Sequence, residues 1–471
     1  MKRRPGSLVT TCFLLVLGGC GGGSGNGAGM PPPGSEPPLT AGPPSPEIVD
    51  ETGVPARSDA ARIAITDVTL VPMDREGSIS GQTVLVENGI IAAIGDSATV
   101  EVPSNAERID GSRRFLVPGL IDMHAHLLTD AGAEHDLVLE LAAGVTTVRI
   151  MWGFGTHLAW REAIQDGDMT GPSLFVASAG LEGPGPYWPG SIVVTSAADA
   201  RAAVDEAGAA GYDFIKVYNQ LQLSPYVAIL DEARTLGIPV VGHVPRAVSA
   251  DFAIENGQWT IEHFSRYAPE VTENGTWSGP IDGSRLEAFI ERLRLAGTWS
   301  CPTLTVQLRS QSQVADLKSN PLYDLLSQPM RDWLESSLTQ PPSGDRSADD
   351  RRRKELLLAL VRAGIGVVVG TDTGVQYVLP GFSIHEELRH FADAGLTPYE
   401  TLRAATAHAA AALGVTDRGA IAVGRRADLL LLDADPLADV THLNRRAGVM
   451  AGGHWYAQST LMEMAAEGAG S

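Results

Sequence analysis

The stretch Val117-Pro118-Gly119-Leu120-Ile121-Asp122-Met123-His124-Ala125-His126 is an apolar run that opens with proline and glycine and ends in two histidines. Its composition predicts a buried strand over Gly119–His124. Successive side chains of a strand point to opposite faces, so His124 and His126, one residue apart, lie on the same side. Two imidazoles on one side can point to the same metal ion, although a His-x-His pair by itself is common by chance.

Outward from this run, apolar segments alternate with helical patterns through the middle of the chain. Eight strands alternating with helices predict an α/β fold, a parallel (β/α)8 TIM barrel over residues 118–417. The polar stretch Val306–Asp350 is longer than a connecting loop requires, which predicts a helical insert or a lid. The other predicted strands are Thr146–Ile150, Leu174–Ser178, Phe214–Val217, Pro239–Gly242, Thr260–Glu262, Thr298–Thr303 and Gly366–Gly370, with helices at Glu134–Ala143, Ala198–Ala210, Pro225–Leu236 and Arg285–Ala296.

Four side chains that can bind a metal ion or transfer a proton lie in or at the ends of the later strands. Lys216 lies within the fourth strand, and His243, His263 and Asp372 end the fifth, sixth and eighth. Barrel enzymes place their working groups at the carboxyl ends of the strands. We therefore expect these residues to meet His124 and His126 at one mouth of the barrel.

Lys216 is one of only four lysines, and it lies between Ile215 and Val217 in a strand predicted to be buried. A buried ammonium group is costly, and desolvation makes it lose its proton readily. A neutral amine can react with carbon dioxide to form a carbamate, an anionic ligand able to bridge two cations. A structural ion pair would explain the same residue equally well.

This combination of motifs resembles the metal-dependent amidohydrolase superfamily from Ile63 to Tyr456, including the closing segment Gly419–Asp433. The resemblance implies a barrel, a composite β-sandwich and a site for two divalent ions, with zinc suited to such ligands. It also implies a hydroxide that bridges the metals, with Asp372 as the general base. By the same resemblance, His124, His126 and Asp372 would hold the first metal, His243 and His263 the second, and a carbamate on Lys216 would bridge them.

Within the superfamily, the sequence favours hydrolysis of an amide-type C–N bond over mononuclear deamination. Deaminase-like members usually carry an acid three residues after the histidine of strand five, where this chain has Arg246. The strand of Lys216 is more similar to prolidases and Xaa-Arg dipeptidases, although Val244 and Pro245 replace a second histidine found in those members. Tyr218, close behind Lys216, is a candidate substrate contact or a packed aromatic.

Two alternatives to amide hydrolysis remain open at this stage. The same activated water would hydrolyse a lactone or a phosphotriester. A non-catalytic binding lipoprotein is the other alternative, but such proteins tend to lose ligands, whereas all six positions are retained here. The expected substrate is a small molecule or a short peptide.

Both ends of the folded part are rich in short β-type runs. Ile63–Leu70, Gln82–Glu87 and Ile90–Ile94 stand near the start, with the turn signal Asn88-Gly89 between the last two. Ala427–Asp433 and later runs have the same texture near the end. These segments predict one composite β-sandwich built from residues 61–117 and 418–471.

The N-terminus carries the features of an export signal. A basic start precedes the apolar run Leu8–Leu17, which is too short to span a bilayer. Leu17-Gly18-Gly19-Cys20 resembles a bacterial lipoprotein signal, so residues 1–19 would be removed and Cys20 lipidated; a plain signal peptide with a chance cysteine is the alternative. Because Gly21 is not acidic, we expect anchoring at the outer membrane, facing the periplasm. Residues 20–60, rich in glycine, proline and serine, predict a tether.

The amino-acid composition limits the classes of partner that the protein can have. The 471 residues contain 35 basic and 56 acidic side chains, a net charge of −21, which argues against nucleic acid as a partner. A 44% hydrophobic share supports a large buried core. Apart from the N-terminal signal, no segment of the sequence is long and apolar enough to span a membrane. Contact with a membrane is therefore expected only through the lipid anchor.

Overall fold

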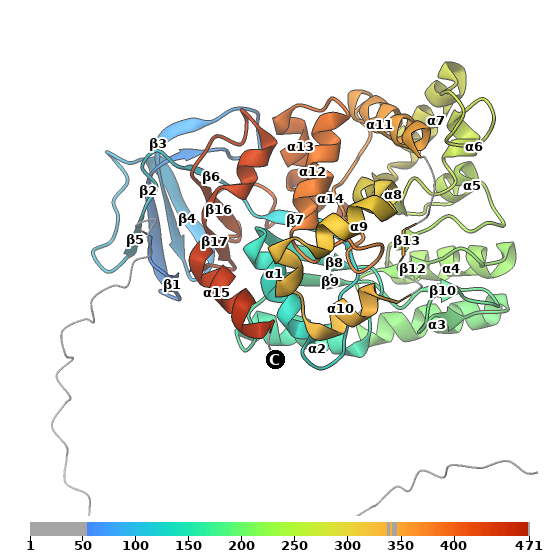
Figure 1. The fold of residues 1–471 in the computed structure, drawn as a ribbon, viewed down its shortest axis with the longest axis horizontal. Coiled ribbons are helices and arrows are strands. Elements are labelled where there is room, and N and C mark those ends of the chain that lie inside the picture. Colours follow the sequence, from blue (N-terminus) through green and yellow to red (C-terminus); the bar gives the residue numbers. More distant parts are fainter. Residues whose placement is uncertain (1–53, 337–339, 342–345, 470–471) are drawn as a thin grey trace, which may run out of the picture. The chain divides into compact units, whose positions relative to one another are not determined.

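The computed structural model describes residues 54–336, 340–341 and 346–469 (Figure 1). The predicted signal peptide, Cys20 and most of the predicted tether lie outside these residues. Within the described ranges, no helix has the length and apolar character needed to cross a membrane.

One mixed sheet contains strands from both ends of the chain, drawn in blue and red in Figure 1. Its strands run in the order β1-β18-β17-β16-β6-β2-β3-β4, and β5 pairs with β2. The two ends meet at two strand pairs, β1 with β18 and β6 with β16, both antiparallel; in the second, Val117 lies opposite Leu430. The strands are β1 Arg57–Ser58, β2 Arg62–Leu70, β3 Ile79–Glu87, β4 Ile90–Asp96, β5 Glu107–Asp110, β6 Phe115–Pro118, β16 Leu429–Leu432, β17 Arg446–Ala451 and β18 His454–Ala457.

Two features of this sheet follow from local sequence. Asn88 and Gly89 adopt positive φ angles of 48° and 78° and turn β3 back onto β4, as a two-residue hairpin requires. The sheet also starts before residue 61, the start expected from the sequence. Val54 is buried, and β1 already pairs with β18.

Two parallel sheets follow β6 in the chain. The strands β7 Leu120–Ala125, β8 Val145–Ile150 and β9 Ser173–Val176 form a three-stranded sheet in that order. A six-stranded sheet has the order β11-β10-β12-β13-β14-β15. Its strands are β10 Leu181–Glu182, β11 Ile192–Val193, β12 Ile215–Val217, β13 Val240–Gly242, β14 Thr260–Glu262 and β15 Trp299–Cys301.

These assigned strands form two separate parallel sheets, whereas the sequence analysis predicted one closed barrel. The predicted eighth strand, Gly366–Gly370, is not a continuous strand in the described chain. The segment makes isolated backbone contacts instead of a ladder, with Val368 donating to Ser300 and Val369 accepting from Met123. Asp372, just beyond it, has a left-handed φ of 64°. Isolated parallel bridges nevertheless join the segments, at Ala177 with Phe214, Ser300 with Val367 and Ala125 with Thr373.

Helices separate most of the parallel strands. Helix α3 begins where Ser196 accepts a hydrogen bond from the Asp199 amide and the Asp199 side chain caps Ser196 in return, a capping box. The helices are α1 Asp136–Ala142, α2 Gly155–Asp166, α3 Ala197–Ala210, α4 Leu223–Leu236, α5 Ala250–Glu255, α6 Ala268–Val271, α7 Gly283–Ala296, α8 Leu304–Leu308, α9 Gln311–Lys318, α10 Gln328–Leu334, α11 Ser347–Arg362, α12 Ser383–Asp393, α13 Pro398–Ala404, α14 Ala407–Ala412 and α15 Gln458–Gly468, with short 3₁₀ turns η1 Ala133–His135, η2 Pro321–Leu325 and η4 Val440–Asn444. Where it is described, the stretch predicted as an insert or lid contains α9, α10 and the start of α11.

Candidate metal centre

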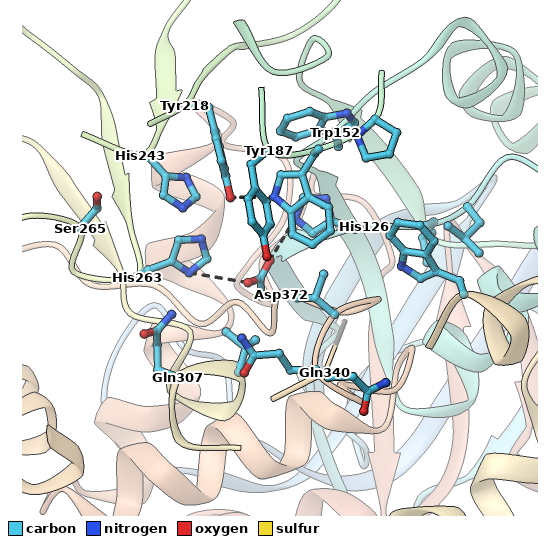
Figure 2. Close-up of a pocket in the computed structure, with 18 of the residues that line it drawn as sticks. His126, Trp152, Tyr187, Tyr218, His243, His263, Ser265, Gln307, Gln340 and Asp372 are labelled. Atoms are coloured by element: carbon cyan, nitrogen blue, oxygen red, sulfur yellow. Dashed lines mark hydrogen bonds and ion pairs between the residues drawn. The ribbon is translucent and has the colours of Figure 1, made fainter. Parts of the chain in front are cut away.

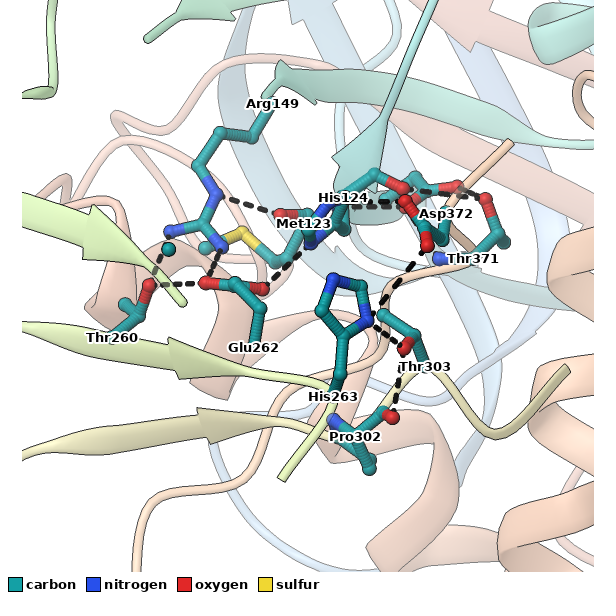
Figure 3. Close-up of polar contacts among 12 residues, drawn as sticks. Met123, His124, Arg149, Thr260, Glu262, His263, Pro302, Thr303, Thr371 and Asp372 are labelled. Atoms are coloured by element: carbon teal, nitrogen blue, oxygen red, sulfur yellow. Dashed lines mark hydrogen bonds and ion pairs between the residues drawn. The ribbon is translucent and has the colours of Figure 1, made fainter. Parts of the chain in front are cut away.

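His124, His126 and Asp372 converge at the carboxyl end of β7. His124 lies within β7, His126 follows it, and Asp372 comes from the segment bridged to β7. Asp372 Oδ1 lies 3.1 Å from His124 Nε2 and 3.0 Å from His126 Nε2, and these two nitrogens are 3.2 Å apart (Figures 2 and 3). Three donor atoms therefore face one small volume.

His243 and His263 stand beside this group, at the ends of β13 and β14 (Figure 2). Their ring centroids are 4.6 Å apart, and His263 lies 4.7 Å from His124 by the same measure. The Thr303 hydroxyl donates to the Pro302 carbonyl, so it accepts from His263 Nδ1, 2.6 Å away. His263 Nε2 then keeps its lone pair. His243 Nδ1 is buried and has no hydrogen-bond partner among the described residues.

Lys216 lies in β12, fully buried, and its Nζ has no hydrogen-bond partner in the described part of the chain. Burial lowers its pKa to about 8, although Glu262 and Asp372 oppose this shift. Gly242, which pairs with Val217 on the neighbouring strand β13, has a φ of 123°, and a Cβ there would lie 2.4 Å from the Val217 carbonyl oxygen and 3.0 Å from Lys216 Cδ. The neighbouring strand thus leaves room for the lysine stem only because residue 242 is glycine.

The surroundings keep the imidazoles of His126, His243 and His263 neutral and the carboxylate of Asp372 ionised. Burial lowers the pKa of His126 to about 4 and that of His263 to about 3, and it holds that of His243 well below its usual value. For Asp372, burial alone would raise the pKa, but His263 and His124 outweigh it and hold the pKa well below the usual range. Neutral imidazoles and an ionised carboxylate are the protonation states in which these groups bind metals.

A buried ion pair fixes the orientation of His124 (Figure 3). Glu262 Oε2 lies 2.8 Å from His124 Nδ1, and Arg149 Nη2 donates to Glu262 Oε1 at 2.9 Å. All three side chains are inaccessible to solvent. Burial opposes ionisation of Glu262, but Arg149 and His124 keep its pKa well below the ordinary value. The carboxylate therefore accepts the Nδ1 proton, which leaves His124 Nε2 as an acceptor facing Asp372.

Two groups of side chains have the spacing of a metal site among the described residues. One contains His124, His263 and Asp372, and the other contains His124, Glu262 and Cys301. In the second group Glu262 is already neutralised by Arg149. The first group is therefore the better candidate.

A cavity of about 610 Å³ opens next to the histidines (Figure 2). Aromatic rings make up much of its lining, and α10 contributes Trp333. Trp188 Nε1 donates to Tyr218 Oη at 2.7 Å, and the ring centroid of Tyr218 lies 4.1 Å from that of His243. The aromatic lining residues are Trp152, Phe154, Tyr187, Trp188, Tyr218 and Trp333.

The structure brings all six predicted ligand positions to one region and places Tyr218 in the cavity wall. The predicted lipidation residue, Cys20, is outside the described chain. Sequence reasoning did not identify Arg149, Glu262 or Thr303 as part of the site. Arg149 could have been found by the criterion that identified Lys216, because it is a charged residue within a strand of buried residues.

The chain belongs to the amidohydrolase family, because residues 115–456 match the sequence profile of that family. Members of this family generally bind divalent metals, and the His/Asp group described above is the candidate site. This match confirms the resemblance to the amidohydrolase superfamily that the sequence motifs indicated.

Solved structures give the same fold class. A bottromycin amidohydrolase is 27% identical, with a TM-score of 0.70 and coverage of 87% of this chain and 91% of that chain. A protein from Bifidobacterium longum, provisionally assigned as a prolidase, is 25% identical with a TM-score of 0.66, over 86% and 99% of the two chains. Among curated sequences, a dihydroorotase from Bacillus thuringiensis (strain Al Hakam) is 39% identical over 85 residues, only 17% of this chain and 19% of the dihydroorotase.

Proposed function

We propose that this protein is a hydrolase that cleaves an amide-type C–N bond in a small molecule or short peptide, with two divalent metal ions. The observation that carries the proposal is the convergence of His124, His126 and Asp372 near the buried amine of Lys216, which has no hydrogen-bond partner among the described residues. The parallel bridges between the two sheets support the interpretation of the middle of the chain as a (β/α)8 barrel with this site at its mouth.

The donor set fits two cations. His124, His126 and Asp372 would hold one ion, and His243 and His263 would hold the other. A carbamate on Lys216 would bridge them and would give the orphaned Nζ a function. Nitrogen and oxygen ligands of this kind suit zinc. When bound, such ions lower the pKa of a water molecule and polarise the scissile carbonyl group.

The protein's own groups would handle the proton. Asp372 is ionised and touches both His124 and His126, so it can accept a proton from the attacking water and pass it to the leaving amine. Tyr218 Oη accepts the hydrogen bond of Trp188, so its own hydroxyl proton remains available for a substrate oxygen. The aromatic walls would exclude bulk water from this reaction.

The relatives support this choice of bond. The bottromycin amidohydrolase and the provisional prolidase are both named for amide-type substrates, and they cover most of this chain. Arg246 again argues against deamination, because the position where a deaminase needs an acid carries a base.

The decisive assay compares the zinc-loaded protein on an N-acyl amino acid, a lactone and a phosphotriester. Amide hydrolysis with the highest kcat/KM supports the proposal. A preference for the lactone or the phosphotriester would reassign the bond while keeping the site. Absence of turnover on all three, with ligands nevertheless bound, would favour the non-catalytic alternative.

Glu262→Gln should weaken metal binding by about 10- to 100-fold, because a neutral amide oxygen is a weaker acceptor for the Nδ1–H group of His124 than the carboxylate. Metal affinity can be measured by competition with a chromogenic chelator. Glu140→Gln is the matched control: Glu140 is equally buried and burial raises its pKa well above the ordinary value, but it belongs to neither group of side chains with metal-site spacing. Equal affinities for wild type and Glu262→Gln would contradict the orienting role of Glu262.

We also propose that the protein is lipid-anchored at a bacterial outer membrane and faces the periplasm. The motif ending in Cys20 carries this proposal. Full-length protein expressed in a two-membrane bacterium should fractionate with outer membranes, and Cys20→Ala should abolish that retention. Mass spectrometry of the mature N-terminus provides the check, and an N-terminus without a diacylglyceryl group would refute the anchor.

A further inference from the structure

The cavity contains one permanently charged basic side chain among its described lining residues, Arg353. Arg353 lies on α11, and its side chain is only 6% exposed. The other described charged residues of the lining are Asp130 and Asp372, besides the histidines. The position of this guanidinium group in the wall of a catalytic cavity requires an explanation.

The bonding of Arg353 is incomplete. Nη1 donates to the His263 carbonyl oxygen at 3.0 Å, and the guanidinium lies 4.6 Å from the centre of the Trp277 ring. Nε is buried without a hydrogen-bond partner in the described chain. Arg353 forms no ion pair with a described carboxylate, and Asp349 acts on its charge only from a longer distance, against the repulsion of Arg346. Burial lowers the pKa of Arg353 to about 10, so the group stays positively charged at neutral pH.

Three of the other buried arginines of the described chain have a carboxylate partner, although Nε of Arg309 also lacks a hydrogen-bond partner there. Arg149 pairs with Glu262, Arg309 with Glu386, and Arg418 with Asp417. Arg446 donates to the carbonyl groups of Leu443 and Ala142 and to the side chain of Gln458. A buried charge without such partners is costly, so an anion that completes the bonding of Arg353 would be bound favourably.

A carboxylate is the anion that matches this group. The planar guanidinium presents parallel N–H donors that fit the two oxygens of a carboxylate. Arg353 contacts the backbone of His263, so an anion bound there would lie near the histidine cluster rather than at the outer rim of the cavity. The surrounding rings, including Trp188 and Trp333, provide apolar surface for the rest of the substrate.

We propose that Arg353 binds a carboxylate of the substrate, and that the substrates are amides of amino acids that keep a free carboxylate beside the scissile bond. This inference rests on the proposed amide hydrolysis and specifies its substrate class.

A matched pair of substrates tests the inference: N-acetyl-L-phenylalanine and N-acetyl-2-phenylethylamine, which share the amide and the ring but differ in the carboxylate. The metal-loaded wild type should hydrolyse the acid with a kcat/KM about 10- to 100-fold higher, the range expected for a charged hydrogen bond. Arg353→Met should lose most of that preference, mainly through KM, and Arg353→Lys should keep part of it. Arg351→Met, on the exposed side of the same helix, should keep the full preference.

The outcomes separate the two proposals. If Arg353→Met lowers kcat/KM equally for both compounds, Arg353 only supports the backbone of His263 and the inference is wrong. The same holds if the wild type prefers the uncharged amide. If the wild type hydrolyses neither compound, the proposed amide hydrolysis fails, and this inference fails with it.

Discussion

Asp372→Asn should lower kcat by about 10²- to 10⁴-fold, the usual contribution of a general base. Asp372 Oδ1 contacts both His124 and His126, and its pKa is held low, so the carboxylate is available to accept a proton. Asparagine has nearly the same shape but cannot accept that proton. The measurement is kcat on an N-acyl amino acid, with metal content and circular dichroism recorded for each preparation.

Asp130→Asn is the matched control for this experiment. Asp130 also lines the cavity, but it is not part of the histidine cluster. Its replacement should leave kcat within a few-fold of wild type. An Asp372→Asn protein with full metal content and unchanged kcat would remove Asp372 from the catalytic role.

Lys216→Ala should reduce bound metal from about two ions per chain to one or fewer, and activity should fall with it. The lysine is fully buried and its Nζ has no described partner, so under the proposal a carbamate on it would supply the anionic bridge from strand β12. Inductively coupled plasma mass spectrometry gives the stoichiometry. Addition of a small carboxylate such as propionate should restore part of both metal and activity, because it can occupy the vacated space.

Lys216→Met is the control for packing in this case. It preserves much of the volume of the lysine stem but cannot form a carbamate. It should lose metal as Lys216→Ala does, without rescue by propionate. Two tightly bound ions in either variant, with normal turnover, would show that Lys216 does not bridge the metals.

The histidines and the aspartate could be found from sequence because their positions follow local rules. The alternation of strand side chains places His124 and His126 together, and the ends of parallel strands meet at one edge. Lys216 could be identified because a charged residue in an apolar strand is costly to bury unless it has a function. Each of these positions can therefore be recognised from the residues next to it in the sequence.

The contacts that organise the site could not be found in this way. Glu262 meets His124 across 138 residues of sequence, and Arg353 reaches the His263 carbonyl across 90. Such pairs depend on the packing of distant elements, which one sequence does not specify by pattern. The predicted eighth strand, Gly366–Gly370, is likewise joined to its neighbour in the described chain only by a single bridge, Val367 with Ser300, which depends on the packing of distant segments.

The most direct test of the account is a metal titration of chelator-treated protein, in which amide hydrolysis and bound zinc are followed together. We predict that activity on an N-acyl amino acid rises with added zinc and saturates at about two equivalents per chain. Saturation of activity at one equivalent, or full activity in metal-free protein, would contradict the account.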